Sequence, residues 1–209
     1  MPRAADPAVR QRLVDVTAAL LANGDDVTLR KVADVAGTST MAVYTHFDGM
    51  DGLWFAVREQ AFGELTSRLA DVAATDDPVA DLVATGAAYV RFALAEPVLY
   101  QAMFDIGRSS AQPPTASISF AVLVAAVERS VTEGRLSRGS DALAAATRFW
   151  AMSHGVISLV LSGALPPEAV DGHLPPMIAA LLVQLGDGPR RAPRSVARGW
   201  EPDRVAATD

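Results

Sequence analysis

The chain has 209 residues and no cysteine, which excludes disulfides, thiolate metal sites and cysteine nucleophiles. Half of the residues are hydrophobic and 20% are charged, a composition typical of a globular helical protein and not of a disordered or fibrous one. The net charge of −6 and the pI near 5.0 argue at first sight against a nucleic-acid partner, because phosphate binding needs clustered Lys and Arg.

The acidic excess belongs to one part of the chain. Residues 1–58 carry 6 basic and 7 acidic side chains, residues 59–186 carry 7 and 13, and residues 187–209 carry 5 and 4. The N-terminal part is therefore close to neutral, and the overall charge does not exclude contact with DNA there.

No segment predicts secretion or a membrane span. The N-terminal stretch MPRAADPAVRQR lacks the apolar core of a secretory signal, so we expect a cytoplasmic protein. Residues 149–167 carry no formal charge over 19 residues, but Ser, Gly, His and a Pro pair interrupt them. We interpret this stretch as a helix buried on one side by its own domain and on the other by a partner chain.

Helical periodicity predicts an all-α chain of about nine helices. The first begins at Asp6 and Pro7 and stops at Gly24, the second is capped by Thr28 and ends at Gly37, and the third runs from Ser39 to Phe47. Further helices are expected after Gly49 up to about Val72, from Pro78 to Pro97, from Pro97 to Phe104, and at about 115–133, 140–162 and 174–185, with loops at 105–114 and 163–173.

The residues after the last of these helices are rich in Arg and Pro and have too few apolar residues for a core of their own, so we expect a flexible tail. The predicted organisation is a DNA-binding domain at 1–49, an effector-binding and dimerisation domain at 50–186, and a tail at 187–209.

The most informative segment is TLRKVADVAGTSTMAVYTHF, residues 28–47. Two short helices meet at Gly37 with apolar residues on their facing sides, which is the pattern of a helix-turn-helix. The turn holds the second of these helices steeply enough for its start to enter a DNA major groove, which is about 12 Å wide. Val43 and Phe47 are expected to point inward. The outward side chains are then Thr40, Met41, Thr45 and His46, with Tyr44 along the edge.

This segment resembles the signature of the TetR family of one-component transcriptional regulators, T-x-x-x-(V/I)-A-x-x-A-G followed by S-x-x-x-(L/V)-Y-x-(H/Y)-F. The matching residues are Thr28, Val32, Ala33, Ala36, Gly37, Ser39, Val43, Tyr44, His46 and Phe47. The resemblance implies an N-terminal three-helix helix-turn-helix domain, a larger C-terminal helical bundle, and a regulator that responds to a small molecule, most often as a repressor.

The resemblance also implies which residues touch DNA. Thr40, Met41 and Thr45 would reach base edges. Thr28, Arg30, Tyr44 and His46 would hold phosphates, together with main-chain N–H groups at the starts of the second helix and of the third helix, which Ser39 begins.

One position departs from the family. Members usually carry a phosphate-binding lysine at the start of the fourth helix, where this chain has Met50. Arg3, Arg10 and Arg12 replace that contact or are solvated surface. A helical hairpin with no role in DNA binding is the alternative interpretation of the whole segment.

A further likeness is to a TetR subgroup with a Trp-x-x-x-His-Gly element, here Trp150 to Gly155. Trp150, His154, Ile157 and Leu161 share one helical stripe. A cavity between this stripe and the fifth and sixth helices would suit a small apolar or aromatic effector, oriented by His154 and Tyr89. The candidate effector-binding residues are Tyr89, Phe92, Tyr100, Met103, Phe104, Trp150 and His154. The alternative is that these residues are plain core.

Residues 156–161 and 177–185 are too apolar around the helix for a surface exposed to water. Paired with their symmetry mates they would form a homodimer, so the DNA site is expected to be an inverted repeat. An effector would act by favouring a different spacing of the two reading heads.

Other function classes find little support. The three histidines, His46, His154 and His173, lie far apart without metal-ligand spacing, and there is no Gly-x-Ser-x-Gly, phosphate loop or dinucleotide fingerprint. We expect no enzymatic activity, no metal and no cofactor. The remaining alternative is a helical small-molecule-binding adaptor that does not bind DNA, which the modest charge of residues 1–58 and Met50 would suit.

Overall fold

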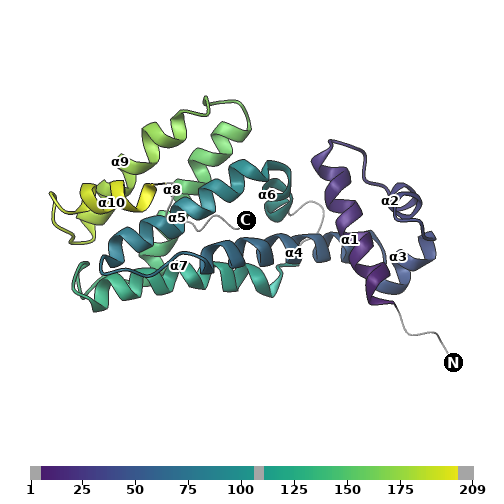
Figure 1. Ribbon diagram of the computed structural model, residues 1–209, viewed down its shortest axis with the longest axis horizontal. Coiled ribbons are helices and arrows are strands. Elements are labelled where there is room, and N and C mark those ends of the chain that lie inside the picture. The colour runs from purple at the N-terminus through teal and green to yellow at the C-terminus, as the bar shows by residue number, and fades with distance from the viewer. Residues whose placement is uncertain (1–5, 106–110, 202–209) are drawn as a thin grey trace. The chain divides into compact units, whose positions relative to one another are not determined.

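The computed structural model describes residues 6–105 and 111–201, so Arg3 of the N-terminal arm lies outside the described residues. The described residues form ten α-helices and no strand, which confirms the all-α prediction (Figure 1). They are α1 (Pro7–Ala22), α2 (Leu29–Val35), α3 (Thr40–Phe47), α4 (Met50–Ala70), α5 (Pro78–Ala95), α6 (Pro97–Phe104), α7 (Pro114–Thr132), α8 (Ala142–Leu161), α9 (Ala169–Gln184) and α10 (Ala192–Trp200).

The helices belong to two compact units. The first unit contains the chain up to Glu64 and residues Glu96–Ser117, and the second contains Leu65–Ala95 and the chain from Ile118 onward. These units do not follow the boundaries at residues 49 and 186 that the sequence suggests, because α6 packs on α1 and is hydrogen-bonded to α4 within the first unit.

The first unit is built around α1, on which α2 and α3 pack (Figure 1). Its core is a cluster of apolar side chains from the first four helices, among them Leu13, Val32, Val43, Phe47 and Leu53. The predicted caps of α1 and α2 are confirmed, whereas Ser39 at the start of α3 makes no side-chain capping bond. The Asp6 carboxylate accepts from the Ala8 amide at 2.9 Å, and the Thr28 hydroxyl accepts from the Lys31 amide at 3.3 Å.

The second unit is built around α5, which is buried from Pro78 to Val90 and is contacted by α8 and α10. α9 packs on both α8 and α10. α10 approaches α5 so closely that a Cβ at Gly199 would lie 2.3 Å from the Ala80 carbonyl oxygen. Only glycine fits that position without a shift of the backbone.

The structure differs from the prediction of a flexible tail after residue 186. Residues 192–200 form α10, in which Ala192, Ser195, Val196 and Gly199 are buried. These four residues recur at spacings of three and four and so lie on one helical face, while the intervening arginines face outward. The Arg and Pro content of the segment conceals this narrow apolar face, and its partner on α5 lies far away in the sequence.

The last predicted helix also begins earlier than expected. α9 starts at Ala169 and not at Leu174, the start that the sequence suggested, so Pro175 and Pro176 lie in the helix interior. Proline removes backbone hydrogen bonds from a helix interior. Here packing maintains the helix, because Val170, Leu174 and Ile178 lie one turn apart and are all buried on either side of the prolines.

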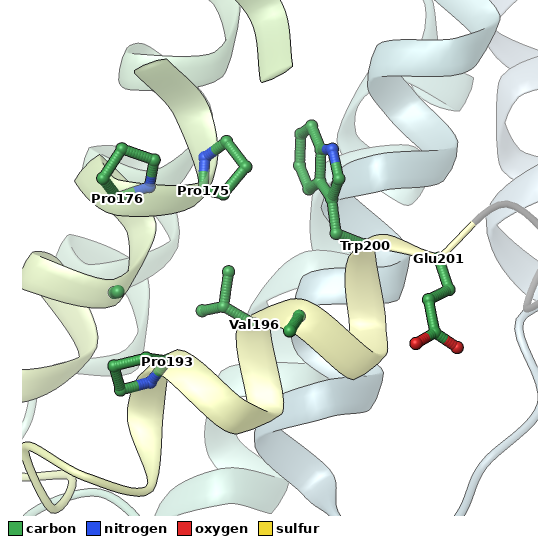
Figure 2. Close-up of a pocket in the computed structure, with 8 residues that line it drawn as sticks. Pro175, Pro176, Pro193, Val196, Trp200 and Glu201 are labelled. Atoms are coloured by element: carbon green, nitrogen blue, oxygen red, sulfur yellow. The ribbon is translucent and has the colours of Figure 1, made fainter. Parts of the chain in front are cut away.

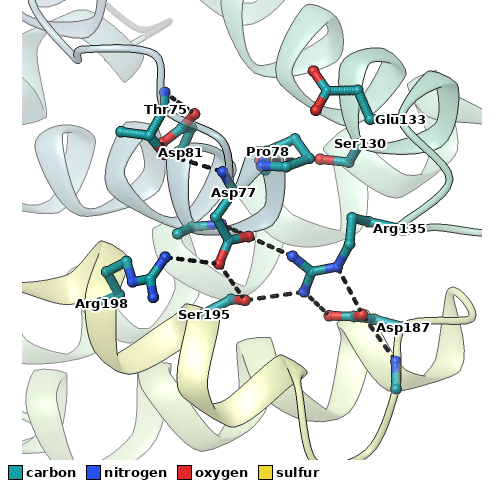
Figure 3. A network of polar contacts seen from close by, with 12 residues as sticks. Thr75, Asp77, Pro78, Asp81, Ser130, Glu133, Arg135, Asp187, Ser195 and Arg198 are labelled. Atoms are coloured by element: carbon teal, nitrogen blue, oxygen red, sulfur yellow. Dashed lines mark hydrogen bonds and ion pairs between the residues drawn. The ribbon is translucent and has the colours of Figure 1, made fainter.

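A buried ionic network holds α10 in place (Figure 3). Arg135, which follows α7, donates to both carboxylate oxygens of Asp187 at 3.2 and 2.9 Å and also to Asp77 and Ser195. The Ser195 hydroxyl in turn donates to Asp77 at 2.8 Å, and Arg198 lies 3.6 Å from the same carboxylate. The network therefore ties α10 and the turn before it to the start of α5.

The charge of Asp77 is stabilised by this arrangement. Burial by itself raises the pKa of Asp77, but hydrogen bonds from Ser195 and the Ala80 amide, together with the charge of Arg135, outweigh burial. The pKa of Asp77 consequently lies below its ordinary value of 3.8. A folded-state pKa below the unfolded one stabilises the protein above the unfolded pKa, and this stabilisation is lost as the pH falls.

Two of the described helices are long and apolar enough to cross a membrane by length and composition, α5 and α7. In α5, 83% of the apolar window is buried inside the protein, so these side chains are core. In α7 the buried share is 22%, and length and composition alone are weak evidence for a span. The uncharged stretch 149–167 is not a single helix, because α8 ends at Leu161.

The network predicts a pH-dependent stability difference. Asp77→Asn should lower the free energy of unfolding at pH 7 by about 1.5–3 kcal/mol, because a hydrogen-bonded charge is lost while the helix cap is kept. Below about pH 4 the difference should shrink, since the carboxylate of the unfolded wild-type chain then takes up a proton and the folded carboxylate follows at still lower pH. Urea denaturation at both pH values measures this. The exposed neighbour Asp76 provides the control, and equal effects of Asp76→Asn and Asp77→Asn would contradict the assignment.

Candidate functional site

The turn between α2 and α3 sets the direction of α3. Gly37 has a φ of +65°, in the left-handed region that favours glycine. The amides of Gly37 and Thr38 donate to the carbonyls of Asp34 and Ala33 at 3.2 and 2.9 Å. These bonds close the end of α2 and fix the residue at which α3 begins.

α3 has one buried and one exposed face, as predicted. Val43 is fully buried and Phe47 is 8% exposed, whereas Met41 and Tyr44 are 68% and 54% exposed. Thr40 and Thr45 are also exposed, and His46 is half-buried with its ring 6.1 Å from that of Phe47. The outward face of α3 therefore presents two large apolar or aromatic side chains and two threonines to solvent.

The junction of α3 and α4 is tight. Asp48 adopts a left-handed conformation with φ of 58°, and a Cβ at Gly52 would lie 1.8 Å from the Phe47 carbonyl oxygen. Met50 is half-buried and packs against the core of the first unit. The residue at the family's lysine position is thus part of the packing around the core.

Among the described residues of the first unit, few cations accompany α3. The Arg10 guanidinium lies 5.2 Å above the Phe47 ring, and Lys31 is paired with Asp25 at 2.8 Å. Arg30 lies 3.8 Å from Asp34, with the two side chains 89% and 69% exposed. Such an exposed pair is weak, so a phosphate competes easily for Arg30.

The second unit holds an aromatic cluster formed by α5, α7 and α8. The Trp150 indole donates to the Tyr89 hydroxyl at 3.2 Å, and that hydroxyl lies 3.2 Å from Nδ1 of His154. The Phe120 ring meets the Trp150 ring edge-on at 6.0 Å. The predicted Trp and His of α8 are therefore in contact with the predicted Tyr of α5.

The surroundings of His154 favour its neutral form. Burial lowers the pKa of His154 below its ordinary 6.5. Because the Tyr89 oxygen already accepts from Trp150, the tyrosine proton is suited to a neutral Nδ1. Trp150, Tyr89 and His154 then form one chain of hydrogen bonds in aromatic surroundings.

The other predicted effector residues divide between the units. Phe92 is fully buried in the second unit, where Arg68 lies 5.4 Å above its ring. Tyr100, Met103 and Phe104 lie on α6 in the first unit, and Tyr100 and Met103 are buried. The Phe104 ring meets those of Tyr100 and Phe62 edge-on at 5.2 and 5.9 Å. Of the seven predicted effector residues, the four on α5 and α8 thus lie in the second unit and the three on α6 lie in the first.

Sequence reasoning missed Phe120 and Arg58. Phe120 is one of several apolar residues on α7 and has no distinctive spacing. Arg58 on α4 is 1% exposed and donates to the carbonyls of Met103 and Ala111 at 3.0 and 2.8 Å and to the Gln112 side chain at 3.2 Å. Burial lowers its pKa. An arginine in a helical sequence is typical of solvated surface, so only the structure identifies it as the group that holds the end of α6.

An apolar cavity of about 430 Å³ between α9 and α10 was also missed (Figure 2). Its lining residues are Pro175, Pro176, Ala179, Pro193, Val196, Ala197, Trp200 and Glu201. The Trp200 indole donates to Asp171 at 2.8 Å, which fixes the ring. The part of the chain that the structure describes contains no group of three or more His, Asp or Glu side chains suited to a metal ion.

Comparison with known proteins agrees with this geometry. Residues 82–181 match the family described as tetracyclin repressor-like, C-terminal domain. None of the curated proteins matches the chain.

Several solved structures share the fold. RolR in complex with the ligand resorcinol is 21% identical, with a TM-score of 0.67 over 92% of this chain and 94% of that one. A protein of unknown function from Rhodococcus sp. RHA1 is 25% identical, with a TM-score of 0.73 over 85% and 94%. The TetR family protein CprB from S. coelicolor A3(2) is 16% identical, with a TM-score of 0.63 over 96% and 100%.

Replacing two glycines of α4, one at the α3–α4 junction and one in open space, should change the stability of the protein in opposite directions. Gly52→Ala should destabilise the protein by about 1–3 kcal/mol, because the new Cβ meets the Phe47 carbonyl. Gly63→Ala, where a Cβ meets nothing within 4 Å, should stabilise it by about 0.5–1 kcal/mol through helix propensity. Urea denaturation followed by circular dichroism measures both. A neutral Gly52→Ala would show that the junction is not closely packed.

Proposed function

We propose that this chain is a repressor of the TetR family, which binds an inverted-repeat operator as a homodimer and is released by a small aromatic or apolar effector. Two findings support it: solved TetR-family structures share the fold, and residues 82–181 match the tetracyclin repressor-like C-terminal domain, which belongs to a DNA-binding and non-enzymatic family. The observation that carries the proposal is the outward face of α3, with Met41 and Tyr44 exposed above a fully buried Val43. Cytoplasmic location follows from it, because the operator lies there.

The proposed DNA contacts divide into two kinds. Thr40, Met41 and Thr45 touch base edges from the exposed face of α3. The phosphate contacts come from Thr28, Arg30, Tyr44 and His46 and from the start of α3 at Ser39. Arg30 supports this role because its ion pair with Asp34 is exposed to solvent and therefore weak. With so few cations, non-specific affinity for DNA is modest.

The proposed dimer forms through α8 and α9. The exposed residues of α8 include Ala151, Gly155 and Ser158, whose small size allows close approach of another helix, and Leu159, which is 47% exposed. On α9, Met177 and Val183 are 39% and 38% exposed. Exposure to water of a face that combines small and large apolar side chains is unfavourable. Two copies related by a two-fold axis would cover it and would present two reading helices to an inverted repeat.

The proposed effector site is the cluster of Trp150, Tyr89 and His154 in the second unit, with Phe92 on the same helix as Tyr89. The other three predicted effector residues, Tyr100, Met103 and Phe104, belong to α6 of the first unit. Aromatic rings offer stacking surface, and the Tyr89 hydroxyl and neutral His154 offer hydrogen bonds to an aromatic ligand that carries hydroxyl groups. The structure of RolR with resorcinol, a small dihydroxybenzene, supports this ligand class.

A helical adaptor without DNA binding is the second candidate. Two observations favour it: Met50 packs on the core where the family has a lysine, and Lys31 is paired with Asp25. Both reduce the positive charge near α3. The binding experiment that follows distinguishes the two functions.

DNA binding and dimerisation are tested together. The wild type should scatter light as a dimer and bind DNA from upstream of its own gene in a salt-sensitive manner, measured by fluorescence anisotropy. Leu159→Glu places two like charges in the interface and should give a monomer whose affinity is about 100-fold lower, because the second half-site no longer contributes. Ile118→Glu, on the exposed face of α7, is the matched control. If the wild type binds no DNA up to micromolar protein concentrations, the regulator function is refuted in favour of the adaptor.

The effector site is tested with resorcinol as the probe. Resorcinol should quench tryptophan fluorescence of the wild type and release bound operator, and Trp150→Phe should abolish both effects while the dimer persists. Trp200→Phe, in the α9–α10 cavity, should leave both unchanged. Loss of quenching in Trp200→Phe alone would assign the ligand to that cavity, and loss of the dimer in Trp150→Phe would mark Trp150 as core.

A further inference from the structure

We propose that α3 recognises its operator through thymine methyl groups, with Met41 and Thr45 contacting the 5-methyl groups of neighbouring thymines in each half-site. This inference rests on the proposed function, since it requires that α3 enters the major groove. It adds the chemical class of base that the reading helix selects.

The side chains of α3 exclude bidentate hydrogen-bond readout of the bases. Bidentate recognition uses Arg or Lys for guanine and Asn or Gln for adenine, and Asp or Glu accept from cytosine. The sequence TMAVYTHF contains none of these six residue types. Its one ring with nitrogen donors, His46, is half-buried beside Phe47. The helix is left with threonine, methionine and tyrosine on its outward face.

Met41 provides the positive argument. Its side chain is 68% exposed on the first turn of α3, the part of a reading helix that approaches base edges. A thioether is only a weak hydrogen-bond acceptor, so Met41 gains mainly from contact with an apolar group. The thymine 5-methyl is the apolar group that the major groove displays.

Thr45 extends the same apolar surface. It lies four residues after Met41, on the same helical face. Its hydroxyl donates to the Met41 carbonyl at 2.9 Å, so the hydroxyl proton is engaged within the helix. Thr45 therefore contributes its methyl group and not a hydrogen-bond donor to the base edges. The pair forms a strip one turn long that can cover methyl groups on adjacent base pairs.

Because the first unit has little positive charge, contacts between α3 and the bases matter more for DNA binding. Phosphate contacts provide affinity without sequence information. With Lys31 paired to Asp25 and Met50 packed on the core, a larger share of the discrimination falls to α3. Each methyl contact then contributes a measurable part of the specificity.

Replacement of thymine by deoxyuridine tests the proposal, because it removes only the methyl group and keeps base pairing. The full chain first selects its operator from a random duplex library, and each thymine of the half-site is then replaced in turn. Each methyl lost at a contacted position should weaken binding about 4-fold, and a symmetric pair about 15-fold. 5-Methylcytosine at such a position should bind better than cytosine.

A variant assigns the contact. Met41→Ala should weaken operator binding and abolish the deoxyuridine effect at one symmetric pair of positions while leaving the others sensitive. Val35→Ala, which removes a 57% exposed apolar side chain from α2, is the matched control and should leave every deoxyuridine effect intact. Circular dichroism of both variants verifies that the fold is kept.

The outcomes separate cleanly. Sequence-specific binding that is unaffected by deoxyuridine at every position overturns the thymine-methyl readout and leaves the repressor function standing. If 7-deazaguanine in the half-site weakens binding and deoxyuridine does not, the thymine-methyl readout is overturned as well, in favour of hydrogen-bond readout. Failure to bind any duplex refutes the proposed function itself, and this inference with it.

Discussion

The geometry of the helix-turn-helix formed by α2 and α3 depends on the packing of Phe47. This side chain ends α3, is 8% exposed, and carries the Arg10 guanidinium of α1 above its ring. Its carbonyl oxygen lies where only a glycine of α4 can approach it. One residue therefore sets the position of α3 against both α1 and α4. Because Phe47 holds the inward face of α3 at the C-terminal end of the helix, the outward face points in a defined direction.

The parts of the fold that local patterns specify were predicted well. Asp6, Thr28 and Gly37 act within a few residues of themselves, so their roles as caps and turn follow from the sequence alone. α10 and the start of α9 could not be found in this way. The four buried residues of α10 gain their stability from α5, and the prolines of α9 are tolerated because packing on both sides outweighs local propensity.

The candidate site shows the same division. The spacing of Trp150 and His154 on one helical stripe can be read from the sequence, which assigned them with Tyr89 to one predicted cavity. Their hydrogen bonds with Tyr89 are known only from the structure. Phe120 and Arg58 carry no such signal, because an apolar residue on α7 and an arginine on α4 are ordinary at their positions. What distinguishes them is burial and partners, and these depend on the whole fold.

The attachment of α10 to α5 has a consequence for biosynthesis. The hydroxyl of Ser195 bonds to Asp77 across 118 positions of chain, and Arg91 near the end of α5 donates to the main-chain carbonyls of Trp200 and Glu201. On the ribosome, α5 emerges long before the helix that covers it. The second unit therefore keeps an apolar helix incompletely covered until residues 192–200 have left the ribosome, a period in which chaperones protect such surfaces.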